Sequence, residues 1–206
     1  MKKNNEKIQS GTVVDHLVEL RSRLLNTFIF LFFSFIVCYF FSENIYSFLV
    51  NPYAEAIIQS GLERRLIFTA LHEAFLTYLK VAFFAAFFIT SPFFLLQIWK
   101  FIAPGLYQNE KKAFFPYLVS TPILFLIGGL IVYYLIMPLA IDFFLSFETP
   151  KSDSNLPIQL EAKVNEYLSL VMKLIFAFGL SFQLPVVLSL LARIGFVDSK
   201  FLKERR

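Results

Sequence analysis

The sequence predicts an all-α, polytopic integral membrane protein with four transmembrane helices. Hydrophobic residues make up 57% of the 206 residues and charged residues 17%, against about 45–50% and about 25% in soluble domains. The apolar residues gather in blocks of about 18 or more, which is long enough for a helix to cross a hydrocarbon layer near 30 Å thick. A soluble core does not require such charge-free blocks, so we expect the helices to lie in lipid.

Four candidate spans follow one another, at about 24–41, 75–98, 113–141 and 167–192. The second and fourth carry Lys80 and Lys173 near their starts, where a long side chain can reach back to the interface. The third is expected to be tilted or kinked, because it contains Pro116, Pro122, Gly128, Gly129 and Pro138. Residues 44–60, with Pro52 in the middle, predict a partly helical segment over the outer face. We expect one membrane domain, residues 1–206, shaped as a curved bundle.

The basic residues predict the orientation. Thirteen of the 19 Lys and Arg residues precede the first span, separate the second from the third, or follow the fourth. The other two connections are longer and rich in acids. By the positive-inside rule, both termini are expected to be cytoplasmic. The polar Met1–Ser10 segment does not resemble a cleavable signal peptide.

Several function classes are disfavoured by composition. Cys38 is the only cysteine, which excludes an internal disulfide and a zinc site built on several thiolates. His16 and His72 fall on opposite sides of the membrane in this topology, so neither a metal site nor a serine–histidine–acid arrangement is expected. No glycine-rich phosphate loop occurs. The net charge of +4 reflects basic loops and not nucleic-acid binding. We therefore expect no enzyme activity, cofactor or metal.

A charged helical stretch, Asp15–Arg21, leads directly into the first span. Its apolar residues form a stripe on one helix face, namely Val13, Leu17, Leu20 and Leu24. Glu19 and Arg23 lie four residues apart on another face. Either they form an exposed ion pair worth about 0.3–0.5 kcal/mol, or Glu19 accepts a guanidinium from a ligand while Arg21 or Arg23 holds the segment. The spacing does not decide between these alternatives.

The connection between the second and third spans, residues 99–112, is the second informative segment. Trp99 and Tyr107 are typical of the headgroup zone. A turn is expected at Pro104, and Glu110 precedes two lysines that could neutralise it. By itself this pattern favours an interfacial loop with a capping acid.

Gln183 is the notable polar residue within the fourth span. A primary amide at that depth needs a partner, worth about 0.6 kcal/mol on average between membrane helices. It therefore either joins two helices or lines a hydrated cavity. Unlike a carboxylate, it does not titrate.

Several motifs together carry a resemblance to a known family. Residues 16–21 (HLVELR) resemble the His-Leu-x-Glu-Leu-Arg signature of TatC, the receptor subunit of the twin-arginine protein translocase. The similarity continues through Ser91-Pro92, residues 97–107 (QIWKFIAPGLY) and Glu110, and resumes at residues 177–186 (AFGLSFQLPV). It covers the chain from Val14 onward.

The resemblance implies a receptor on the cytoplasmic face that binds the paired arginines of signal peptides on folded precursor proteins. By motif position, Glu19 and Glu110 would contact those arginines, with Arg21 and Phe101 supporting the surface. Carboxylates are suited to recognising arginine because a guanidinium fork binds a carboxylate bidentately, whereas lysine does not. Pro52, Pro92 and Pro104 would be structural, Pro52 by shaping the outer cap.

The resemblance also implies partners and a location. The expected partners are small single-span subunits of the TatA/TatB type, further copies of the chain and the lipid bilayer, in the bacterial cytoplasmic (inner) membrane.

Two departures from the family pattern matter. Many members carry Glu where Gln183 stands, and we expect Gln183→Glu to be tolerated if the position only polarises its surroundings. The family has six spans, and the four here lead us to expect a fragment, a truncated product or half of a split receptor. The alternatives are an assembly-defective remnant and, less favoured, half of a small-solute transporter. The middle of the spans offers little for a solute path, namely Thr90, Ser91, Ser181 and Gln183.

Overall fold

The structure is a computed structural model that describes residues 13–61, 64–102, 111–149 and 158–193. Seven α-helices and one π-helical segment occur in these ranges: α1 (Val13–Phe40), α2 (Ser42–Ser60), α3 (Glu73–Ile102), α4 (Lys111–Ile131), η2 (Val132–Ile136), α5 (Met137–Leu145), α6 (Val164–Ser181) and α7 (Leu184–Arg193). Four stretches are long and apolar enough to cross a membrane: Leu17–Phe40, Glu73–Ile98, Pro116–Leu145 and Val164–Ala192. The prediction of an all-α fold with four spanning helices is therefore confirmed.

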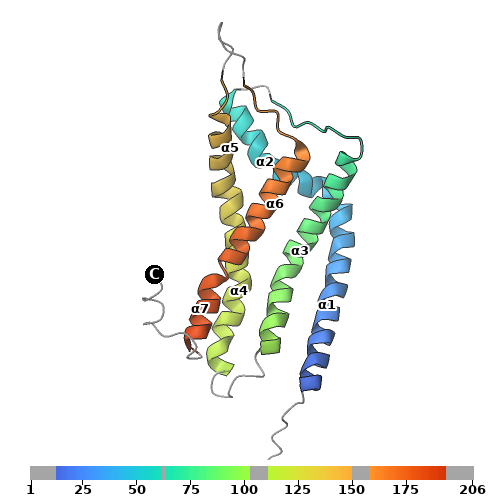
Figure 1. The fold of residues 1–206 in the computed structure, drawn as a ribbon, viewed down its shortest axis with the longest axis vertical. Helices are drawn as coiled ribbons and strands as arrows, with labels where there is room; N and C mark the ends of the chain where they lie inside the picture. The colour runs from blue at the N-terminus through green and yellow to red at the C-terminus, as the bar shows by residue number, and fades with distance from the viewer. Residues whose placement is uncertain (1–12, 62–63, 103–110, 150–157, 194–206) are drawn as a thin grey trace, which may run out of the picture.

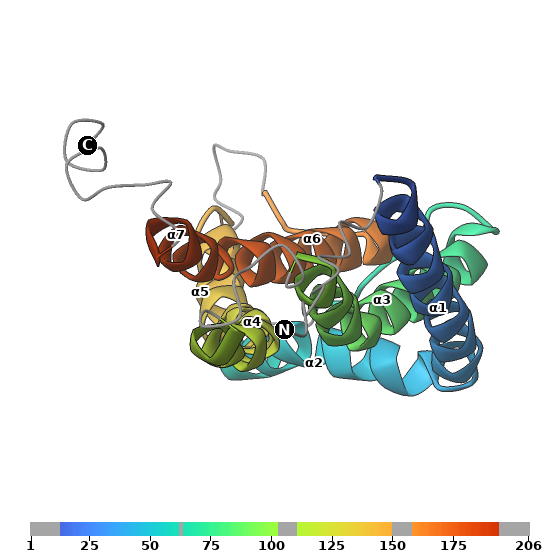
Figure 2. The same ribbon diagram turned by 90° about the horizontal axis from the view of Figure 1, so that it is seen from below.

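The helices form a flattened bundle (Figures 1 and 2). Helix α1 lies at one edge and packs mainly on α3, whereas α4, η2 and α5 form one continuous rod at the other edge. Helix α6 packs against that rod and against α3. Helix α2 lies across the top of the bundle in Figure 1, and we call this the α2 end. The opposite end, where α1 begins and α3 terminates, is called the Glu19 end.

Two of the expected spans depart from a regular α-helix, each next to a proline. In the third span, the Met137 N–H bonds to the Val132 carbonyl, five residues back, immediately before Pro138. Such a π-turn is a known way to change the helical register. The fourth span divides into α6 and α7 around residues 182–183, directly before Pro185. This division was not predicted from the hydropathy of the sequence.

Helices α4 and α6 cross almost backbone to backbone. A Cβ atom placed on Gly128 would lie 3.0 Å from both the Gly179 Cα and the Phe178 carbonyl oxygen. Small residues allow this approach, which is a common basis of helix association in lipid. The two glycines therefore fix the position of α6 against the third span.

The largest buried cluster lies toward the α2 end and joins α2, α3, the η2–α5 rod and α6. It contains Leu49, Tyr53, Ala56, Ile57, Val81, Phe84, Val132, Met137, Ile141, Val164, Tyr167, Leu168, Val171 and Ile175. Because this cluster draws on three spans and on α2, it fixes α2 across the bundle.

Pro52 lies buried inside α2. Proline has no backbone N–H, so the Phe48 carbonyl, four residues earlier, has no helical donor. The Tyr133 hydroxyl donates to that carbonyl at 2.8 Å, and the Tyr133 ring stacks on Phe48 with centroids 4.3 Å apart. The Tyr167 hydroxyl donates to the next carbonyl, that of Leu49, at 3.1 Å. Tyrosines from the third and fourth spans therefore hold α2 at its proline.

A bidentate ion pair joins the connections at the α2 end. The Arg64 Nη2 donates to the Glu148 Oε2 at 3.0 Å, and the Arg64 Nε donates to the Glu148 Oε1 at 3.2 Å. The Leu160 N–H donates to the same carboxylate at 2.8 Å. These bonds hold the pKa of Glu148 below its usual range, the Arg64 bond being the main cause.

Candidate functional site

The candidate site is built around Glu19 in the second turn of α1. The Nε and Nη2 atoms of Arg23 donate to its Oε1 at 3.0 and 2.5 Å. The remaining Nη1 of Arg23 donates to the Gln97 Oε1 at 3.0 Å, near the end of α3. Arg23 therefore connects the Glu19 carboxylate on α1 to an amide on α3 that lies 74 residues after Arg23 in the sequence.

The backbone below this network is also fixed. The Thr27 hydroxyl donates to the Arg23 carbonyl at 3.0 Å, and the Thr27 side chain is buried. Since α1 packs on α3, with the Phe30 and Phe93 rings in contact, the helix that carries Glu19 has a defined position. The carboxylate itself stays accessible, with 36% of the Glu19 side chain exposed.

Of the two alternatives for Glu19, the ion pair with Arg23 is present in the structure. A partly exposed pair of this kind contributes only about 0.2–1 kcal/mol. The pairing nevertheless orients the Glu19 carboxylate, because two donors of Arg23 contact the same oxygen.

Arg21 and Phe101 occupy different places. Arg21 is exposed, and two residues from Glu19 it lies on another face of α1. Phe101 is half-buried in the last turn of α3, four residues after Gln97 and thus on the same helix face. The structure therefore places Phe101 on the Gln97 side of α3.

Glu110 and Pro104 lie outside the described residues. The helices that border this segment end at Ile102 and begin again at Lys111. Both borders lie at the bottom of the bundle in Figure 1, as does the start of α1. Glu19 and the borders of the Glu110 segment are therefore at one end of the molecule.

Gln183 lies away from this site, between α6 and α7. Its side chain is buried, and its Nε2 donates to the Thr121 carbonyl of α4 at 2.9 Å. Of the two alternatives for this amide, the geometry matches the one in which it joins two helices.

Pro92 lies in α3, where it removes the helical donor of the Phe88 carbonyl. The Ser91 hydroxyl donates to that carbonyl at 2.7 Å. The serine beside the proline thus satisfies the backbone oxygen that the proline leaves without a partner.

The bond between Arg23 and Gln97 was not anticipated from the sequence. The available signal was an amide near the end of an otherwise apolar span, at a motif position to which no role had been assigned. Within the described ranges, no group of three or more His, Cys, Asp or Glu residues could hold a metal ion. The contacts at Glu19 join carboxylate, guanidinium and amide groups.

Comparisons with known proteins agree with these observations. A protein-family profile described as "Sec-independent protein translocase protein (TatC)" matches residues 15–206. The TatC protein of Magnetococcus marinus is 46% identical over 198 residues, which cover 96% of this chain and 70% of that protein. The TatC protein of Rickettsia prowazekii is 46% identical over 192 residues, covering 93% and 75%. That of Escherichia coli K12 is 34% identical over 194 residues, covering 94% and 72%.

The fold comparison gives the same result. A crystal structure described as "Crystal Structure of Twin Arginine Translocase Receptor- TatC in DDM" matches with a TM-score of 0.76 and 33% sequence identity, covering 92% of this chain and 80% of that one. The profile spans nearly the whole sequence, and the fold matches over most of the chain. The chain therefore belongs to the TatC family of Sec-independent protein translocase components.

Proposed function

We propose that the Glu19 end is the receptor site for the paired arginines of twin-arginine signal peptides, with Glu19 and Glu110 as the two carboxylates. The observation that carries the proposal is the network at Glu19, in which an accessible carboxylate is oriented by Arg23 and Gln97 at the end of the bundle that borders the Glu110 segment. In this function the protein is a receptor and scaffold and not an enzyme.

An exchange of guanidinium groups explains how Glu19 would bind its ligand. An incoming arginine shares the carboxylate with Arg23 or displaces it. Gln97 gives the displaced Arg23 a remaining acceptor, so the resident cation does not have to leave the site. Hydrogen bonds to charged groups contribute about 1.5–3 kcal/mol each, so two carboxylates together would select a pair of arginines. Lysine would bind more weakly because it lacks the planar fork.

The proposal includes an orientation and a set of partners. The excess of Lys and Arg at the termini and between the second and third spans supports a cytoplasmic Glu19 end. The similarity to bacterial TatC proteins supports a location in the bacterial inner membrane. Folded precursor proteins would supply the signal peptides. Small single-span subunits of the TatA/TatB type and further copies of the chain would bind along its membrane-facing helices, where large apolar side chains are exposed.

Of the four polar residues considered for a solute path, three have partners within the bundle, and the fourth, Thr90, is buried with no hydrogen-bond partner for its hydroxyl among the described residues. The Ser91 and Ser181 hydroxyls donate to carbonyls within their own helices, and Gln183 donates to α4. These groups are used within the helix bundle, so a receptor is favoured over half of a small-solute transporter.

Site-specific cross-linking of a twin-arginine signal peptide tests the site. We expect Glu19→Ala or Glu110→Ala to abolish cross-linking. The control is Glu43→Ala, which removes an exposed carboxylate at the α2 end and should leave cross-linking intact. A peptide with two lysines in place of the arginines should bind the unchanged protein weakly. Unchanged cross-linking in both the Glu19 and Glu110 variants would reject the site.

Complementation of a receptor-null strain tests the activity of the chain. We expect export to be restored when the chain is supplied together with the C-terminal part of a longer relative. Failure in that combination, with normal membrane insertion of both parts, would favour an assembly-defective protein.

A further inference from the structure

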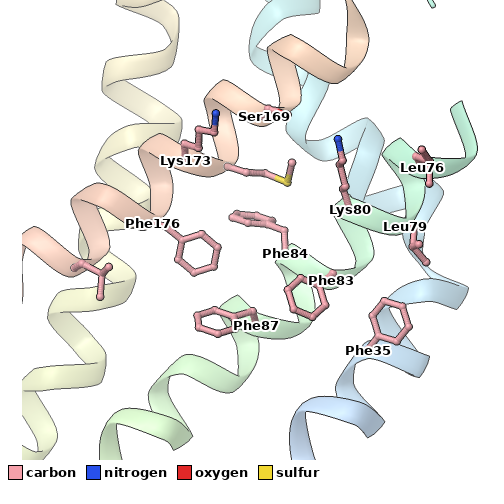
Figure 3. Close-up of a pocket in the computed structure, with 12 residues that line it drawn as sticks. Phe35, Leu76, Leu79, Lys80, Phe83, Phe84, Phe87, Ser169, Lys173 and Phe176 are labelled. Atoms are coloured by element: carbon pink, nitrogen blue, oxygen red, sulfur yellow. The ribbon is translucent and has the colours of Figure 1, made fainter. Parts of the chain in front are cut away.

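A groove of about 940 Å³ lies between α1, α3 and α6 (Figure 3). Its lining is apolar apart from Lys80, Lys173 and Ser169, and consists of Phe35, Leu76, Leu79, Lys80, Phe83, Phe84, Phe87, Ser169, Met172, Lys173, Phe176 and Leu180. No carboxylate belongs to this lining. The groove is separate from the Glu19 network, which involves none of these residues.

The two lysines lie on opposite walls of the groove, one on α3 and one on α6. In Figure 3 both ammonium groups lie above the phenyl rings of Phe84 and Phe176. Lys80 lies seven residues after the first residue of α3, and Lys173 lies nine residues after the first residue of α6. These separations correspond to roughly 10 and 14 Å along the helix axes. Lysines at this depth extend their ammonium groups toward the interface while their stems cover apolar surface.

Neither lysine has an acidic partner within the described residues. The Lys80 Nζ donates to the Asn165 Oδ1 at 2.7 Å, which satisfies one of its three donors with a neutral group. Lys173 is exposed, and no ion pair within 4.0 Å involves either residue in the ranges the structure covers. Two positive charges at the edge of the hydrocarbon layer are unfavourable without a counter-charge, so the groove is complementary to an anion attached to an apolar chain.

We propose that this groove binds one anionic phospholipid from the leaflet at the α2 end, with its phosphate between Lys80 and Lys173 and an acyl chain against the phenylalanines. The volume lies in the range of about 300–1,000 Å³ typical of ligand pockets. An apolar helix in the same groove would cover both ammonium groups without neutralising them. A phospholipid supplies the negative charge and the apolar chain in one molecule.

Native mass spectrometry of the purified full chain tests the proposal. The probes are dioleoylphosphatidylglycerol, which is anionic, and dioleoylphosphatidylcholine, which carries the same acyl chains on a zwitterionic headgroup. We expect the unchanged chain to retain the anionic lipid preferentially. The K80Q/K173Q variant should lose retention by on the order of fivefold for each lysine. The matched control, R65Q/K163Q, removes two cations outside the groove and should retain the lipid as the unchanged chain does.

Two further variants separate the contributions of charge and groove. K80R/K173R keeps both charges and should keep the preference. Ser169→Trp fills the groove while both lysines remain, and should lower retention of the anionic lipid. Circular dichroism checks that each variant is folded.

Four outcomes would overturn the proposal. These are equal retention of the two lipids by the unchanged chain, full retention by folded K80Q/K173Q, full retention by folded Ser169→Trp, and displacement of the lipid by inorganic phosphate alone. Displacement by an apolar 20-residue helical peptide at equal concentration, with no effect of the lysine variants, would identify the groove as a helix-docking surface instead.

Discussion

The two ends of the bundle are held by different interactions. At the α2 end, a large buried cluster joins α2 to three spans. Two tyrosine hydroxyls also donate to α2 carbonyls, and a bidentate ion pair joins the connections. At the Glu19 end, one arginine joins α1 to α3 through partly exposed groups, and a small cluster around Val186 and Leu190 packs α7 on α4. The first span, which carries Glu19 and runs between both ends, is 11% buried, against 39% for the second.

This difference indicates a division of roles. Local stability varies within a protein, and regions with few buried contacts open most easily. The α2 end fixes the relative positions of the spans, whereas the polar groups at the Glu19 end can exchange partners. In the proposed receptor function, a ligand would rearrange the site without disturbing the bundle.

Truncating a buried side chain at the α2 end should produce the largest effect. Leu49 is 2% exposed within the main cluster, and Leu→Ala changes in a core cost about 2–5 kcal/mol. We expect Leu49→Ala to lower the thermal unfolding midpoint in detergent strongly. The matched variant Leu25→Ala, at a residue 50% exposed near the Glu19 end, should change it little. Equal effects of the two variants would contradict the proposed difference between the ends.

Removal of the charge on Glu148 should have the next largest effect. Because the folded state lowers the pKa of Glu148, its stabilisation is fully present above the ordinary glutamate pKa. It is lost as the pH falls through the lower pKa of the folded state. We expect Glu148→Gln to lower the unfolding midpoint at pH 7 and to reduce its decline under acid conditions. Midpoints measured from pH 7 to pH 3 check this, and an identical acid profile would contradict it.

The tyrosine bond to α2 should contribute less. Tyr167→Phe keeps the ring and leaves the Leu49 carbonyl without this donor, which should cost about 1–3 kcal/mol. The control is Tyr134→Phe, at a ring that is 67% exposed. Hydrogen exchange of the α2 amides should accelerate in the first variant only, whereas equal exchange would show that the hydroxyl does not hold α2.

The smallest expected effect lies between the two ends, at Gln183. Gln183→Met removes the donor to Thr121, which should cost about 0.6 kcal/mol on average for a bond between membrane helices. Gln183→Glu should be tolerated, since a protonated carboxyl can donate to the same carbonyl. Unfolding midpoints and export assays of both variants measure this. Lost export in the folded Gln183→Glu variant would show that the amide has a more specific role.

The predicted fold could be read from the sequence because lipid imposes simple rules on a spanning helix. The length and low charge of the apolar blocks predicted all four spans. They did not predict the division of the fourth span before Pro185, because the residues on both sides of the break are apolar. Likewise Pro52 was recognised as a structural residue, whereas its partner Tyr133 lies 81 positions away in another span.

The candidate site shows the same limit. The motif around Glu19 and the spacing to Arg23 were visible in the sequence, and the connection to Gln97 was not. Arginine has several donors and a long stem, so its neighbours in sequence do not determine which acceptors it reaches in space.

The sequence by itself determined the membrane class, the four spans and the family, because hydropathy and short motifs are local properties of the chain. Only the tertiary structure decided which distant groups meet: Arg23 with Gln97, the tyrosine hydroxyls with the α2 carbonyls, and two lysines across one apolar groove. The physical reason is that the crossing of the helices brings these groups together, and those crossings depend on close contacts such as that between Gly128 and Gly179.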